Sequence, residues 1–267
     1  MNLLKQSHGW ESVRCSAHTL QLADHSAIGA DARIQSVLAN ARKLVEHFRR
    51  SSTPNSALTK QQEKMQLKPR DLVQDVANRW SSTFSMCKRL KELRLPVSMV
   101  RANREIIDLQ KRQQLELTTN SWFVLESLCD VLEPFADLTQ YLEGQSYVSI
   151  SALQPLIKGV VIAMGVNVDD LEFIANFKRE ASKQLDSRFA DLFSIQAPTR
   201  DHSAGRVAIA AEACAVDKRF HKLKSLGSGQ PLIVRRSLEN ELIAFGRINQ
   251  QPQPDANSTR NTDLTSE

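Results

Sequence analysis

Apolar residues recur at the spacing of an α-helix over most of this chain, and this repeat limits the possible folds more than any other feature. The segment 31–50 is the clearest case, because its apolar residues follow a period of 3.6 and Asp31 precedes them as a plausible N-cap. The same pattern predicts helices over 16–27, 122–142, 150–164 and 171–189. Aromatic residues make up only 6% of the chain, and the other apolar residues are mostly Leu, Ile, Val and Ala. This balance favours helices over an all-β sandwich.

Several shorter segments depart from the helical pattern. Residues 12–15 and 71–76 are predicted as short strands, and 51–55 as a loop before a short helix that ends near Met65. A helix is expected from Trp80 to about Leu95, with Pro96 as its limit. Pro134 is expected to kink the helix that contains it.

Charge is distributed unevenly along the chain. Residues 1–94 contain 16 Lys and Arg against 8 Asp and Glu, whereas residues 120–186 contain 10 acidic and 4 basic residues. The basic first third indicates a surface that faces a polyanion, with a solvated charged face as the plainer alternative. The acidic block is not expected to lie on DNA phosphates.

Cysteine spacing and hydropathy restrict the environment of the protein. The four cysteines, Cys15, Cys87, Cys129 and Cys214, are widely separated, so reduced thiols in the cytosol or nucleus are expected. We find no apolar run of about 18 residues, and therefore expect no membrane span.

Cys15 and His18 form a CxxH unit at the start of a predicted helix. Thiolate and imidazole both bind zinc, but a zinc site normally has four ligands and the rest of such a set is not evident. From these residues alone, a buried thiol and a hydrogen-bonded imidazole with a structural role are the better interpretation. We therefore predict no metal here.

Arg79 and Trp80 follow the second predicted strand. Arginine pairs with phosphate, and tryptophan offers a flat face for an unstacked base. Taken alone, Trp80 is better interpreted as a core anchor. Asp71 and Asp75 could pair around Mg²⁺, although solvated or capping aspartates are the simpler interpretation. We find no Walker loop, GxGxxG, HExxH or CxxC motif.

The ordered series of motifs is more specific than its members. It resembles the hAT transposase superfamily, especially the domesticated zinc finger BED domain-containing proteins, over about residues 10–195. The residues that carry the resemblance are Arg14–Leu22 with the CxxH unit, Ala41–Phe48, Asp75–Phe84 with the Arg-Trp pair, Trp122, Leu132–Phe135 with Thr139, and Leu185–Phe189.

The resemblance implies an RNase H-like catalytic domain interrupted by a helical insertion, with a DDE carboxylate triad that uses Mg²⁺ or Mn²⁺. In that family the CxxH unit lies near the active site, and Cys15 and His18 match it. The family's Arg-Trp pair begins the insertion, and its Trp stacks at a flipped-out base, so Arg79 and Trp80 are the implied DNA contacts.

The chain also departs from the family pattern. Both catalytic aspartates would precede residue 1, and the final Glu belongs to a region whose signature is absent here. The usual Thr-Arg-Trp-Asn is Asn78–Ser81 in this chain, and Ser187 replaces a proline. We therefore expect a catalytically inactive protein that is not an enzyme and holds no cofactor at the missing triad.

The predicted fold is mainly α with a small α/β part, namely an incomplete RNase H-like core followed by a helical insertion domain. The expected divisions are a partial core and start of the insertion over 1–95, the helical insertion over 96–195, a weakly defined helical remainder over 196–249 and a disordered tail over 250–267.

Three functions remain open. The first is a transposase-derived, nuclear DNA-binding protein with a possible role in transcriptional regulation. The second is a helical module that binds proteins or forms homo-oligomers without DNA. The third, a residual nuclease that uses Asp71 and Asp75, is the weakest.

Overall fold

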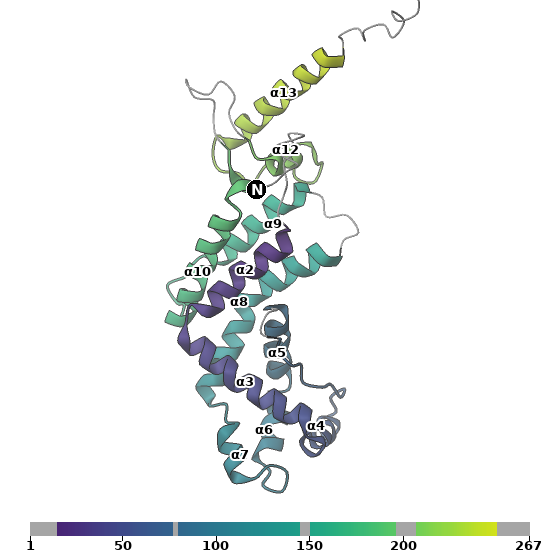
Figure 1. Cartoon of the computed structure of the whole chain (residues 1–267), viewed down its shortest axis with the longest axis vertical. Helices are drawn as coiled ribbons and strands as arrows, with labels where there is room; N and C mark the ends of the chain where they lie inside the picture. The colour runs from purple at the N-terminus through teal and green to yellow at the C-terminus, as the bar shows by residue number, and fades with distance from the viewer. Residues whose placement is uncertain (1–14, 77–79, 145–149, 196–206, 250–267) are drawn as a thin grey trace, which may run out of the picture.

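The structure is a computed structural model that describes residues 15–76, 80–144, 150–195 and 207–249. Its described elements are helices, shown in Figure 1. They are α2 (Ser16–Gly29), α3 (Ala32–Arg50), α4 (Ser52–Lys64), α5 (Trp80–Glu92), α6 (Arg94–Ala102), α7 (Leu109–Gln114), α8 (Thr119–Gly144), α9 (Ile150–Ala163), α10 (Glu172–Arg188), α11 (Ala190–Phe193), α12 (Ile209–Val216) and α13 (Gln230–Asn249).

The predicted amphipathic helix is α3, and it forms as its sequence indicates. Asp31 accepts hydrogen bonds from the backbone N–H groups of Arg33 and Ile34, which caps the first turn. Basic side chains in the last turn complement the helix dipole. The complete apolar stripe is buried: Ile34, Val37, Leu38, Ala41, Leu44, Val45 and Phe48.

Helix α8 is the centre of the packing. It contacts α2, α3, α5, α9 and α10, and Figure 1 shows α2, α3 and α5 arranged along it. Phe135 of α8 meets Phe177 of α10 edge to face, with ring centroids 6.4 Å apart. The main hydrophobic core therefore runs from α2 through α10. A smaller cluster joins α12 to α13 through Ala211, Cys214, Leu223 and Val234.

Two prolines lie in the first turns of helices, although the sequence predicts a loop at Pro54 and the end of a helix at Pro96. Pro54 lies in the first turn of α4, so the predicted loop over 51–55 is wrong beyond Ser51. Pro96 lies in the first turn of α6, which begins two residues after α5 ends. The first helical N–H groups have no partner within the helix, so a proline there removes no hydrogen bond. Helix α8 continues through Pro134.

The predicted strand over 71–76 is also wrong, because this segment pairs with no other strand. Among the described residues, β pairing is limited to one isolated bridge between Ile195 and Val207. The mainly helical prediction is confirmed. The RNase H-like sheet is not seen in the described ranges, while residues 12–14 of the other predicted strand and the tail 250–267 lie outside them.

Candidate nucleic-acid interface

The CxxH unit lies at the beginning of α2, and both of its side chains are exposed. The Cys15 carbonyl accepts hydrogen bonds from the backbone N–H and the hydroxyl of Thr19, both at 3.0 Å. The structural interpretation of a buried thiol and a hydrogen-bonded imidazole is therefore wrong for Cys15 and His18. No cluster of three or more His, Cys, Asp or Glu residues suited to a metal ion is found in the described part of the chain.

The predicted DNA contacts lie at the junction between an extended segment, residues 67–76, and α5. Trp80 is the first residue of α5, and its side chain is not described. Arg79 lies outside the described residues. What the structure does describe is the framework on each side of this pair.

That framework is centred on Asp75, whose side chain is fully buried. Its carboxylate accepts hydrogen bonds from Arg42 Nε of α3 at 2.6 Å, Ser82 Oγ at 2.7 Å and Thr83 Oγ1 at 3.0 Å. The Val76 N–H donates to Ser82 Oγ at 2.8 Å. Asp75 and Val76 precede residues 77–79, whereas Ser82 and Thr83 follow them. We call the group Arg42, Asp75, Val76, Ser82 and Thr83 the Asp75 clamp.

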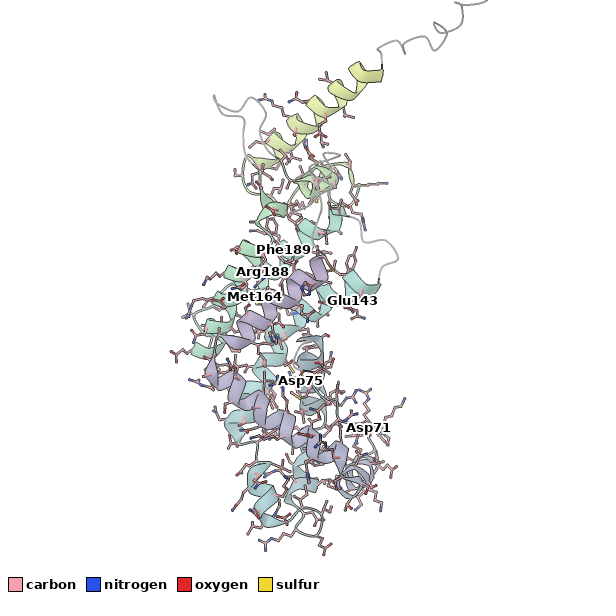
Figure 2. All side chains as sticks on the ribbon, in the orientation of Figure 1. Asp71, Asp75, Glu143, Met164, Arg188 and Phe189 are labelled. Carbon is pink, nitrogen blue, oxygen red and sulfur yellow. The ribbon has the colours of Figure 1, made fainter. Side chains whose placement is uncertain are left out.

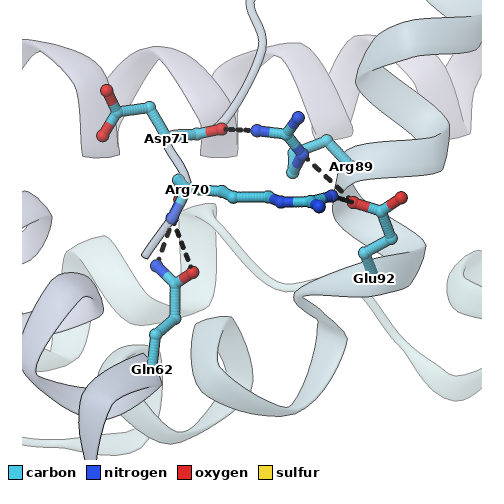
Figure 3. A network of polar contacts seen from close by, with 5 residues as sticks. All are labelled: Gln62, Arg70, Asp71, Arg89 and Glu92. Carbon is cyan, nitrogen blue, oxygen red and sulfur yellow. Dashed lines mark hydrogen bonds and ion pairs between the residues drawn. The ribbon is translucent and has the colours of Figure 1, made fainter. Parts of the chain in front are cut away.

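Side chains of three helices hold the rest of the extended segment, as Figure 3 shows at its beginning. Gln62 of α4 accepts from the Arg70 N–H at 2.9 Å and donates to the Arg70 carbonyl at 3.1 Å, as a neighbouring strand would. Arg89 of α5 donates to the Asp71 carbonyl, and Arg49 of α3 donates to the Leu72 carbonyl. In a sheet, a neighbouring strand would bond these backbone groups. Here side chains bond the Arg70 N–H and the carbonyls of Arg70, Asp71 and Leu72, so the segment needs no partner strand at these positions.

The two aspartates proposed for a residual metal site have different environments. Asp75 is neither solvated nor capping, since its carboxylate is committed to the clamp. Asp71 is exposed, and Figure 2 shows it toward α4, away from Asp75. Only the Asp71 main chain takes part in the network of Figure 3. The arrangement offers a divalent ion no paired carboxylates.

Exposed lysines lie on the extended segment and on two of the helices that hold it. Lys60 and Lys64 lie one turn apart on α4, Lys43 lies on α3, and Lys68 lies on the segment itself, all with exposed side chains. Among the neighbouring arginines, Arg50 pairs with Glu46, and Arg70 pairs with Glu92. The lysines therefore supply the available positive charge on this surface.

Part of the acidic block neutralises cations of the basic third. Asp130 of α8 bonds Lys91 of α5 at 2.8 Å, and Glu126 of α8 bonds Arg94 of α6 at 2.7 Å. The hydrogen bond to Asp130 raises the pKa of Lys91. These contacts orient α5 and α6 on α8, so the block also has a structural role that its net charge did not reveal.

Residues 13–131 match the family model described as the ZBED1 RNase-like helical domain. The chain is 28% identical to zinc finger BED domain-containing protein 4 of Homo sapiens over 146 residues, which cover 55% of this chain and 12% of that protein. It is also 28% identical to zinc finger BED domain-containing protein 6 of Homo sapiens and to that of Mus musculus over 156 residues, 58% of this chain and 15% of each relative. The matched part is thus a small fraction of each relative's length. None of the helices within the described ranges combines the length and apolarity needed to cross a bilayer.

Proposed function

We propose that this chain, which is similar over part of its length to zinc finger BED domain-containing proteins, binds DNA through the surface around the extended segment. Exposed lysines of α3, α4 and the segment contact phosphates, and Arg79 and Trp80 engage the DNA at the start of α5. The protein acts without cutting DNA, in the nucleus, as a regulator of transcription.

The observation that carries this proposal is the Asp75 clamp. It joins α3, the extended segment and α5 immediately on both sides of residues 77–79. A binding segment whose flanking residues are fixed loses less conformational freedom when it binds. The clamp fixes the residues on either side of the Arg-Trp pair, and this supports a role of the pair in binding.

A salt series measured by fluorescence anisotropy with a labelled DNA duplex tests the phosphate contacts. Binding that releases counterions gives a linear decrease of log affinity with log salt concentration, by about 0.9 for each phosphate contact. The double variant Lys60→Gln/Lys64→Gln removes two exposed charges from α4 and is expected to reduce the slope by about 2.

A matched control removes two charges from the acidic block, through Lys158→Gln/Lys183→Gln on α9 and α10, and should leave the slope unchanged. A flat slope for the unmodified chain would contradict DNA binding. Equal slopes for the α4 variant and the control would remove α4 from the interface.

A second candidate function, protein binding by the helical block, is favoured by exposed apolar side chains in the last turn of α9 and in the connection to α10. Val168 is fully exposed and Ile162 is 70% exposed. Light scattering coupled to size-exclusion chromatography tests self-association through this region. A mass above that of one chain that returns to one chain in Ile162→Asp/Val168→Asp supports it, and a monomer at all concentrations argues against it.

A further inference from the structure

A second group of cations lies at the other end of the molecule, outside the segment matched to the family. The turn over 217–226 connects α12 to α13 and carries Lys218, Arg219, His221, Lys222 and Lys224. All five side chains line one cavity of about 430 Å³, which Pro155 of α9 closes on one side. Figure 1 shows α12 against α9 at the end opposite α6 and α7.

Three hydrogen bonds fix this basic turn against α9. The Ser151 hydroxyl donates to Asp217 at 2.6 Å, and the Ser225 hydroxyl donates to Gln154 at 3.1 Å. The Cys214 thiol at the end of α12 donates to the Ser151 carbonyl at 2.8 Å. Asp217 and Ser225, which flank the cationic run of the turn, are therefore both held on α9, so the cavity is formed before any ligand arrives.

Leu223 sets the conformation between two of the lysines. It is buried in the smaller core and has a φ of 52°, in the left-handed region that residues with a side chain rarely adopt. While Leu223 faces inward, its neighbours Lys222 and Lys224 both line the cavity. Such strain at a non-glycine residue persists only where the surrounding structure fixes it, and it is common at binding sites.

Within the described ranges, the ion pairs leave much of the positive charge of the cavity unpaired. Asp217, at the start of the turn, bonds both Arg219 and Ser151, and these bonds hold the pKa of its carboxyl well below its usual range. The side chains of Lys218, Lys222 and Lys224 make no ion pair with the described residues. The Arg219 guanidinium also lies over the Phe220 ring, 5.0 Å from its centroid. Three lysines therefore remain to attract an anion.

We propose that this basic turn is a second phosphate-binding site, for the backbone of duplex DNA. All the lining cations are exposed, so the cavity cannot enclose a small phosphorylated molecule, but it can receive phosphates of a polymer that continues past it. The choice of DNA rests on the proposed function. The protein would then contact DNA at two basic regions, separated along the chain by the acidic block.

The test uses the full chain with the substitutions Lys222→Gln/Lys224→Gln and a labelled DNA duplex in the same salt series. Two lost phosphate contacts are expected to reduce the slope of log affinity against log salt by about 2 relative to the unmodified chain. The control Lys158→Gln/Lys183→Gln should retain the original slope. Leu223→Gly, which suits a positive φ, keeps all charges and is expected to keep the slope, although it removes a side chain from the smaller core.

A slope in Lys222→Gln/Lys224→Gln equal to that of the control would overturn the site while leaving the proposed function intact. A reduced slope in Lys222→Gln/Lys224→Gln, with an unchanged slope in Lys60→Gln/Lys64→Gln, would support DNA binding by the basic turn and contradict DNA binding by α4. No binding by the unmodified chain would overturn both. Polyglutamate is a competitor that lacks phosphate. If it displaces the labelled duplex as strongly as unlabelled duplex does, at equal charge, the ligand of the basic turn is an acidic protein and not phosphate.

Discussion

Asp24 and Asp75 are both buried, and their surroundings differ completely. Asp75 is neutralised by Arg42 and accepts two further hydrogen bonds from hydroxyls. Asp24 of α2 is 0% exposed, and neither of its carboxylate oxygens has a partner. The comparison indicates that the hydrogen-bonded Asp75 carboxylate stabilises the fold, whereas burial of the unpartnered Asp24 carboxylate destabilises it. Three substitutions are expected to change the free energy of unfolding in ways that test this difference.

The largest effect is expected for Asp75→Ala. It removes the carboxylate that Arg42, Ser82 and Thr83 bond, although other bonds of the extended segment to α5, such as those of Val76 to Ser82 and of Asp71 to Arg89, remain. The free energy of unfolding should decrease by about 3–5 kcal/mol, as for the loss of one partner from a buried ion pair. Urea denaturation measures this change, and a decrease below about 1 kcal/mol would show that the clamp contributes little to the fold.

The opposite sign is expected for Asp24→Asn at neutral pH. Burial raises the pKa of Asp24 well above its usual value, so the folded state keeps a proton that the unfolded chain has released. Raising the pH therefore favours unfolding, from the unfolded pKa of about 3.9 up to the raised pKa of the folded state. Asparagine does not ionise, so the variant should be more stable at pH 7 by about 1–3 kcal/mol.

Unfolding free energies measured across this range should converge at its acidic end, where the carboxyl is neutral in both states. The same pH dependence in Asp24→Asn and the unmodified chain would show that Asp24 does not contribute to it. A less stable variant at pH 7 would contradict the unpartnered environment of this carboxyl.

The smallest of these effects is expected for Gln62→Ala. The substitution removes both bonds to the Arg70 backbone, but Arg70 is exposed and water can replace the lost partner. A loss of about 1 kcal/mol in unfolding free energy is expected. Gln62→Met is the matched control, since it keeps most of the volume of this buried side chain and loses both hydrogen bonds, and its loss should be similar. A much smaller loss in Gln62→Met than in Gln62→Ala would show that packing of the Gln62 side chain, and not its two hydrogen bonds, holds the segment.

The helices were predictable because their information is local. The stripe of α3 and its Asp31 cap lie within 20 residues of sequence and require no knowledge of the partner helices. The burial of Asp24 could also be predicted from the sequence, since Asp24 shares a helical face with the apolar residues Leu20 and Ala27. Pro54 and Pro96 misled the prediction, because a proline in a first turn and a proline after a last turn leave similar patterns in a sequence.

The candidate site was less predictable because its contacts connect distant segments. Arg42 and Asp75 are 33 residues apart, and no local pattern pairs them. Residues 71–76 are predicted as a strand, but arginine side chains bond the Asp71 and Leu72 carbonyls where a neighbouring strand would. The basic turn lies beyond the segment that carries the family resemblance, so its lysines had no motif to mark them.

If the Asp75 clamp positions the Arg79–Trp80 pair for DNA, the effects of Ser82→Ala and Trp80→Ala on DNA affinity depend on each other. A double-mutant cycle between these substitutions, measured as affinity for a labelled duplex, tests this dependence. We expect Trp80→Ala to weaken binding by about 1–3 kcal/mol, as for the loss of one stacked base, and Ser82→Ala to weaken binding only while Trp80 is present. Additive effects of the two substitutions, or no effect of either, would contradict it.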